Sequence, residues 1–125
     1  MKVEIARIPS SSIAPHEASM IDIPNNVDGL TAIVVRSSKK LSAWINSCPH
    51  DGRQLCNDPK YLWNKELNRV QCMHHQAIFD PDTGFCDNGP CRGENLTSLP
   101  VVENNGEIVI FMEIMQIRGG LNVYF

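Results

Sequence analysis

The sequence lacks any long hydrophobic run. Its longest apolar runs, residues 32–35 and 108–112, hold four and five residues, whereas a membrane-spanning helix needs about twenty. The sequence also lacks an excess of basic residues, because 11 Lys and Arg stand against 14 Asp and Glu for a formal charge of -3. That balance gives no polyanion-binding footprint. We therefore expect neither a membrane nor a nucleic acid as a partner.

The sequence also lacks the usual signatures of catalysis and export. No glycine-rich phosphate loop, Ser/His/Asp arrangement or pair of acid–base carboxylates stands out, and Glu4 and Arg7 interrupt the N-terminal segment where a signal peptide would be apolar. We therefore expect a cytoplasmic protein. The chain has 125 residues, the size of one domain, and five cysteines. Because this number is odd and cytoplasmic thiols stay reduced, the cysteines indicate free thiols or a metal site.

Short apolar segments separated by turn residues predict an all-β protein with mostly antiparallel strands. Asn104-Asn105-Gly106 is a strong hairpin signal because Asn and Gly tolerate positive φ. Residues 80–84 (Asp-Pro-Asp-Thr-Gly) predict another turn, and only residues 59–68 have room for a helical turn. Strands are expected at residues 3–8, 30–36, 41–46, 69–71, 99–102 and 107–112, with a further possible strand at 121–125.

Cysteine and histidine cluster in two places. Cys48-Pro49-His50 is followed, after 21 residues, by Cys72-Met73-His74-His75, and each motif follows an expected strand. Two strand-end loops that face each other would offer two thiolates and two imidazoles to one site. A tetrahedral zinc site takes such a set, and so does a Rieske-type [2Fe-2S] cluster. Each loop supplies one Cys and one His. This arrangement suits a two-iron cluster better than it suits a zinc finger, in which both histidines follow both cysteines.

The two motifs resemble those of the Rieske [2Fe-2S] proteins. The matching segments are 48–52 (Cys-Pro-His-Asp-Gly), 72–75 (Cys-Met-His-His), 77–80, 83–84, 89–91 and 99–101, within roughly residues 30–112. The resemblance implies a Rieske-type fold of antiparallel sheets with a small cluster-binding subdomain of two loops, at about 47–92. We expect residues 1–125 to form a single Rieske domain.

The resemblance also implies the ligands of one [2Fe-2S] cluster per chain. Cys48 and Cys72 would hold the inner iron as thiolates, and His50 and His75 would hold the outer iron near the surface. His74 is then a neighbour and not a ligand. Two features depart from the family: Gln76 stands where a Gly is common, and the gap between the motifs is somewhat longer than usual.

Residues around the expected cluster separate the types of Rieske protein. The respiratory, high-potential type has a disulfide between its two loops, but the corresponding positions here are Arg53 and His74. That type also places a Ser and a Tyr hydroxyl toward the cluster, where this chain has Ala77 and Phe79. Hydrogen-bond donors raise the potential. We therefore predict a potential near the low end of the roughly -150 to +300 mV range.

The functional expectation is an electron carrier with no catalytic activity of its own. Only 50 residues follow His75 and none is a histidine, so the mononuclear iron domain of an oxygenase is not expected. The resemblance is closest to small Rieske ferredoxins, which carry electrons from a flavin-dependent reductase to a terminal oxygenase or another redox enzyme. The alternatives are the small subunit of nitrite reductase, a zinc-stabilised Cys2His2 binding module, and a sensor or structural subunit.

The other cysteines, the two tryptophans and the C-terminal tail give further expectations. Cys56, Cys86 and Cys91 are interpreted as free thiols, with Cys91 packed near the site and a Cys86–Cys91 disulfide unfavoured in a reducing compartment. We expect Trp44 and Trp63 to pack in the core. The protein is expected to be a monomer or a weak homo-oligomer that associates through its C-terminal tail.

Overall fold

A computed structural model describes residues 2–23, 31–49, 54–55, 58–72 and 77–113. The expected all-β class is confirmed: apart from two short 3-10 turns, η1 (Ser10–Ser12) and η2 (Pro59–Tyr61), the elements in these ranges are all strands. In this part of the chain, no helix is long and apolar enough to cross a membrane. The strands are β1 (Lys2–Pro9), β2 (Glu17–Asp22), β3 (Thr31–Arg36), β4 (Leu41–Ile45), β5 (Trp63–Asn64), β6 (Arg69–Gln71), β7 (Ile78–Phe79), β8 (Cys86–Asn88), β9 (Ser98–Leu99), β10 (Val101–Asn104) and β11 (Glu107–Glu113).

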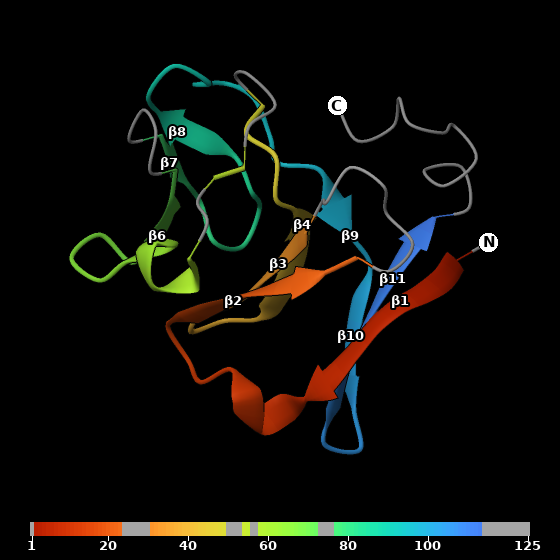
Figure 1. Ribbon diagram of the computed structural model, residues 1–125. Coiled ribbons are helices and arrows are strands. Elements are labelled where there is room, and N and C mark those ends of the chain that lie inside the picture. The colour runs from red at the N-terminus through yellow and green to blue at the C-terminus, as the bar shows by residue number, and fades with distance from the viewer. Residues whose placement is uncertain (1, 24–30, 50–53, 56–57, 73–76, 114–125) are drawn as a thin grey trace.

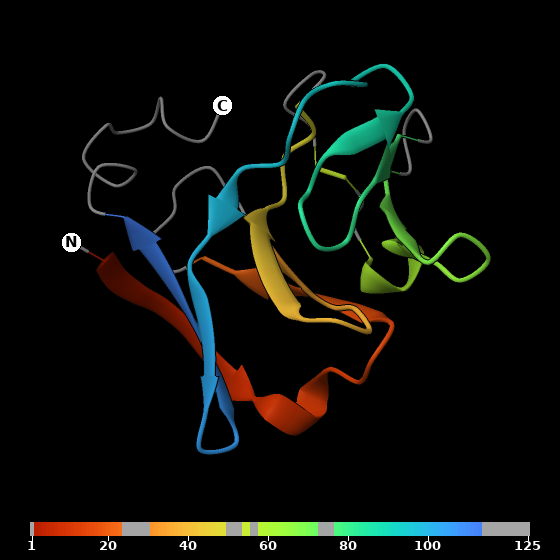
Figure 2. The same cartoon turned by 180° about the vertical axis from the view of Figure 1, so that it is seen from behind.

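The strands form three antiparallel sheets. The first has the order β1-β11-β10, the second β2-β3-β4-β9 and the third β5-β6-β7-β8. The second sheet lies between the other two in both views of the molecule (Figures 1 and 2). The third sheet is built from the segments that contain the second Cys/His motif and its surroundings. That residues 1–125 form one domain, with a subdomain at about 47–92, stays a prediction.

Within the central sheet, β3 is buried on both faces, which explains why it is apolar along its length. One face of β3 and β4 contributes Ile33, Val35 and Trp44 to a core that it shares with the third sheet. The opposite face contributes Ala32 and Val34 to a core shared with β11. A strand covered on both sides shows a continuous apolar run, and the alternation of a half-buried strand is absent.

The predicted hairpins are present, with one correction. Asn105 and Gly106 both have positive φ, 53° and 79°, and join β10 to β11 in a two-residue turn of the kind that favours these residues. However, residues 99–102 are not one strand. Leu99 ends β9, which pairs with β4, whereas Val101 begins β10, which pairs with β11. Pro100 separates them, because proline has no backbone N–H for a strand ladder.

The other expected elements agree with the structure in most places. Strands expected at 3–8, 30–36, 41–46, 69–71 and 107–112 correspond to β1, β3, β4, β6 and β11. Within residues 59–68, the only helical turn is η2, and the same range then contains β5. Trp44 and Trp63 are buried as expected. The expected strand at 121–125, and with it the C-terminal tail, lies outside the described residues.

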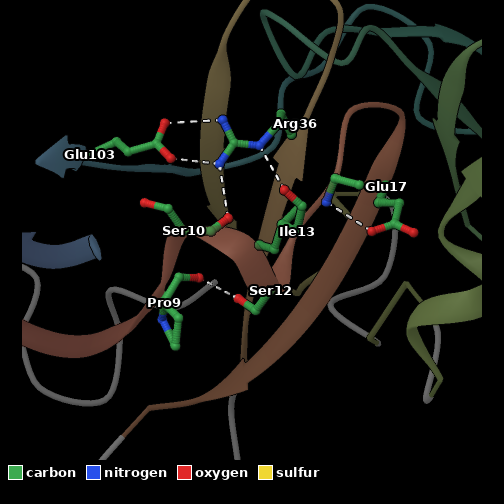
Figure 3. Close-up of polar contacts among 8 residues, drawn as sticks. Pro9, Ser10, Ser12, Ile13, Glu17, Arg36 and Glu103 are labelled. Atoms are coloured by element: carbon green, nitrogen blue, oxygen red, sulfur yellow. Dashed lines mark hydrogen bonds and ion pairs between the residues drawn. The ribbon is translucent and has the colours of Figure 1, made fainter. Parts of the chain in front are cut away.

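An arginine at the end of β3 joins the first two sheets (Figure 3). The Arg36 guanidinium donates to both carboxylate oxygens of Glu103 in β10, at 3.0 and 2.7 Å. Its Nε also donates to the carbonyl oxygen of Ile13 at 2.8 Å, in the segment that connects β1 to β2. This one side chain therefore holds three separate parts of the chain together.

Candidate metal centre

The first Cys/His motif begins where β4 ends, and a buried asparagine anchors it. The Asn46 side chain is fully buried. Its amide nitrogen donates to the hydroxyl of Thr31 at 2.9 Å, and its amide oxygen accepts from the backbone N–H of Leu55 at 2.8 Å. Leu55 is itself fully buried in the core. The segment that carries Cys48 is therefore tied to the central sheet before and after the motif.

The second motif begins where β6 ends. Cys72 directly follows β6, and its backbone N–H donates to the carbonyl oxygen of Ala77 at 2.9 Å. Ala77 in turn precedes β7, which pairs with β6. Cys72 therefore follows β6 and Ala77 precedes β7, two neighbouring antiparallel strands of the third sheet.

The two cysteines of the motifs are brought into one core. Cys48 and Cys72 are 2% and 1% exposed and belong to the same cluster of buried residues. The predicted imidazole ligands His50 and His75, together with His74, Gln76 and Arg53, lie outside the described residues. Among the residues that the structure describes, no group of three or more metal-ligating side chains is found. The four-residue ligand set therefore stays a prediction.

A third segment, residues 86–94, packs against Ala77, which lies two residues after the second motif. A Cβ atom at Gly89 would lie 2.8 Å from the Cα of Ala77, and Gly89 has a φ of +100°. Only glycine combines that backbone conformation with so close an approach. Cys86 and Cys91, on either side of Gly89, are 0% and 1% exposed and share the core with Cys48 and Cys72. The third segment therefore closes over the core beside the expected cluster.

The four described cysteines, Cys86 and Cys91 among them, are outside disulfide bonds. Burial raises the pKa of the Cys91 thiol well above its ordinary value, and the neighbouring Cys86 and Cys48 side chains raise it further. Cys91 is buried in the same core as Cys48 and Cys72. Cys56 lies outside the described residues.

The residues that distinguish the types of Rieske protein are buried near the second motif. Ala77 and Phe79 are 1% and 0% exposed and belong to the same core as the two cysteines. Neither side chain carries a hydroxyl. Asn46 and Gly89 were missed from the sequence as residues that shape the site. A polar residue after the apolar 43–45 run was the available signal for Asn46, whereas the contact of Gly89 with Ala77 depends on tertiary packing.

Comparison with known proteins gives one family and a set of similar structures. The sequence matches the Rieske [2Fe-2S] domain family over residues 8–110. No match is found among curated protein sequences. The ferredoxin of carbazole 1,9a-dioxygenase from Nocardioides aromaticivorans IC177 is 25% identical, with a TM-score of 0.64 over 87% of this chain and 95% of the ferredoxin.

Two further structures share the fold. A complex of reduced oxygenase and oxidized ferredoxin in carbazole 1,9a-dioxygenase contains a chain that is 19% identical, with a TM-score of 0.64 over 87% of this chain and 91% of that one. The terminal oxygenase of carbazole 1,9a-dioxygenase from N. aromaticivorans IC177 is 18% identical, with a TM-score of 0.65 over 88% of this chain and 31% of the oxygenase. The same fold is thus found in a small protein and as part of a larger one.

The described residues fit the cofactor of this family. Cys48 and Cys72 bring two reduced sulfurs into one water-excluded core, and iron neutralises thiolates whose burial would otherwise cost several kcal/mol. A Rieske cluster takes two cysteines on one iron and two histidines on the other. The family match spans most of the sequence, and the similar structures confirm the fold. The chain belongs to the Rieske [2Fe-2S] domain family, whose cofactor is a [2Fe-2S] cluster.

Proposed function

We propose that this protein is a one-electron carrier of the ferredoxin kind, which passes electrons in the cytoplasm from a flavin-dependent reductase to a terminal oxygenase. The observation that carries the proposal is the likeness to the carbazole 1,9a-dioxygenase ferredoxin, which extends over 95% of that ferredoxin at 25% identity. By contrast, this chain covers only 31% of the terminal oxygenase with the same fold. We propose that this protein is an electron-transfer component without catalytic activity of its own.

The proposed ligands are Cys48 and Cys72 on the inner iron and His50 and His75 on the outer iron. When bound, the cluster accepts and donates single electrons. The burial of Cys48 and Cys72 supports an inner, water-excluded position for the two sulfurs. Two neutral imidazoles replace two thiolates and so reduce the negative charge at the centre, which favours reduction relative to a four-cysteine cluster.

The surroundings support a low potential within the Rieske class. Ala77 and Phe79 are buried beside Cys72 and provide no hydroxyl donor. Donors to the cluster sulfurs stabilise the reduced, more negative form and raise the potential. We therefore place the midpoint near the low end of the roughly -150 to +300 mV range, a value suited to accepting electrons from a reduced flavin.

The proposed partner is an oxygenase because a protein of this fold is found with one. A solved complex joins reduced oxygenase and oxidized ferredoxin in carbazole 1,9a-dioxygenase, and its ferredoxin-sized chain aligns with this one over 91% of its length. We propose that this protein docks in the same way, with the outer iron and its two histidines toward the partner. An electron would then cross a short gap between two clusters.

Electron exchange with both partners tests the carrier role. The holo-protein is mixed with a flavin-dependent reductase and NADH, then with the oxidised terminal oxygenase from N. aromaticivorans IC177, while the visible absorption of the cluster is followed by stopped flow. We expect reduction by the first and reoxidation by the second, with neither in protein from which iron has been removed. A cluster that dithionite reduces but that exchanges no electrons with either protein would contradict the carrier role.

A further inference from the structure

The turn between β7 and β8, residues 80–84, joins the third sheet to the central sheet. Asp82 in this turn accepts a hydrogen bond from the hydroxyl of Ser37 at 2.5 Å, and Ser37 begins the turn between β3 and β4. In the same segment, a Cβ atom at Gly84 would lie 2.7 Å from the Nε1 atom of Trp44 in β4, and Gly84 has a φ of +76°. The turn therefore meets the central sheet at two points.

The Ser37 hydroxyl is directed toward Asp82 by the bonds that it accepts. Its oxygen accepts from the backbone N–H groups of Lys39 and Lys40 at 3.0 and 3.1 Å, which fills both acceptor positions of a hydroxyl. Its single proton has two acceptors within reach, the Lys40 carbonyl at 3.2 Å and the Asp82 carboxylate at 2.5 Å. The carboxylate is closer and charged, so it forms the stronger bond. Because Ser37 is only 7% exposed, water competes poorly for this proton.

On its other side, the turn is tied to the strand that precedes Cys72. One oxygen of the Asp80 carboxylate accepts from the backbone N–H groups of Asp82 and Thr83 at 2.8 and 3.1 Å, and these bonds fix the shape of the turn. The other oxygen accepts from the guanidinium of Arg69 at 2.9 Å. Arg69 is the first residue of β6, and Cys72 directly follows this strand. A series of bonds therefore joins the second motif to the central sheet.

Two clefts adjoin the Ser37–Asp82 bond. One has a volume of about 260 Å³ and is bordered by both of these residues. The other has a volume of about 400 Å³ and is bordered by Asp82 and Ser42. Open space provides no packing contacts. The spacing of the two sheets at this point therefore depends on the hydrogen bond more than on packed side chains.

The two Cys/His motifs belong to the two sheets that this bond joins. The first motif follows β4 of the central sheet, and the second follows β6 of the third sheet. We propose that the Ser37–Asp82 hydrogen bond is a clamp that sets the spacing between the two motifs, which makes Ser37 and Asp82 positioning residues for the cluster. The proposal rests on the proposed function, since it requires both motifs to bind one cluster. Bonds beyond the ligands orient the ligands themselves, so loss of the clamp should weaken the hold on the cluster.

The test measures how fast the holo-protein loses its cluster to an iron chelator, together with electron paramagnetic resonance of the dithionite-reduced protein. Asp82→Ala should lose the cluster about fivefold faster than the wild type, because a hydrogen bond to a charged group is lost. Its Rieske-type signal should also be broader, because loosened motifs hold the cluster in a range of geometries. Asp82→Asn keeps an acceptor for the Ser37 proton and should lie between the wild type and Asp82→Ala.

Two further variants separate the clamp from a general loss of stability. Ser37→Ala combined with Asp82→Ala should lose the cluster no faster than Ser37→Ala alone, because both residues act through one bond. Asp87→Ala is the matched control. Asp87 faces the Arg69 guanidinium at 3.6 Å, but among the described residues it has no bond to the central sheet. Its rate of cluster loss and its signal should equal those of the wild type.

The failure of the clamp differs from the failure of the carrier proposal. An Asp82→Ala variant that loses its cluster at the wild-type rate overturns the clamp and leaves the carrier proposal standing. A double variant that is clearly faster than Ser37→Ala, or an Asp87→Ala variant as fast as Asp82→Ala, does the same. A wild-type protein that binds no [2Fe-2S] cluster overturns both proposals.

Discussion

At the scale of single residues, Asn46 shows how a polar side chain supports a metal site without binding the metal. It is fully buried, and its amide joins Thr31 on the central sheet to the backbone of Leu55 beyond the first motif. A buried asparagine is tolerated because both ends of its amide have partners. Its function is therefore to fix the segment from which Cys48 extends.

Replacement of Asn46 tests this positioning role. Asn46→Ala leaves the Leu55 N–H and the Thr31 hydroxyl without their partner, and a buried unsatisfied group costs about 1–3 kcal/mol. We expect a lower free energy of unfolding in urea and faster bleaching of the cluster in the presence of a chelator. Asn64→Ala is the matched control, because Asn64 also accepts from backbone N–H groups, those of Glu66 and Leu67 at 3.0 Å, but in a turn outside the motifs. Equal bleaching rates for the two variants would contradict the role of Asn46.

At the scale of elements, the sequence predicted the strands whose pattern is local. The β-branched run of β3 and the Asn105-Gly106 turn before β11 could be predicted from the sequence, because β propensity and a preference for positive φ are properties of a few adjacent residues. Residues 17–22 (Glu-Ala-Ser-Met-Ile-Asp) show neither a run nor a clear alternation. They form β2 because they pair in register with β3, from Glu17 opposite Arg36 to Asp22 opposite Thr31. Tertiary pairing here decides what local propensity leaves open.

The site shows the same division between local and tertiary information. The ligand set stays a prediction, and it could be made from the sequence because the resemblance to Rieske proteins rests on Cys and His at fixed spacings. Asn46 and Gly89 were missed as parts of the site, and only Asn46 had a local signal, a polar residue after an apolar run. The role of Asn46 depends on Leu55, nine residues further along the chain, and that of Gly89 on its contact with Ala77, the residue before β7. Such contacts exist only after the sheets have packed.

At the scale of the whole molecule, the Arg36–Glu103 pair links two sheets (Figure 3). The Arg36 guanidinium lowers the pKa of the Glu103 carboxyl from 4.5 to about 2. Because the folded pKa lies below the ordinary one, the pair stabilises the fold fully above about pH 4.5. This stabilisation is lost as the pH falls from 4.5 through about 2.

A Glu103→Gln variant tests that linkage. The side chains of Arg36 and Glu103 are 20% and 35% exposed, so solvent screens the pair and we expect a loss of about 1 kcal/mol in the free energy of unfolding near neutral pH. The difference between wild type and variant should shrink as the pH is lowered, because protonated Glu103 no longer pairs as an anion. Glu107→Gln is the control, since its ion pair with Arg7 is more exposed, at 46% and 47%. A difference that grows on acidification would contradict the linkage.

The whole molecule combines three antiparallel sheets with the buried side chains of Cys48 and Cys72, and the proposed function depends on what these two cysteines hold. Electron paramagnetic resonance of the dithionite-reduced protein, with iron and zinc quantified in the same sample, tests this most directly. We predict about two irons per chain and a Rieske-type signal that His50→Ala and His75→Ala abolish and His74→Ala retains. A colourless protein that contains zinc, or a Rieske-type signal that survives His50→Ala, would contradict the proposed centre.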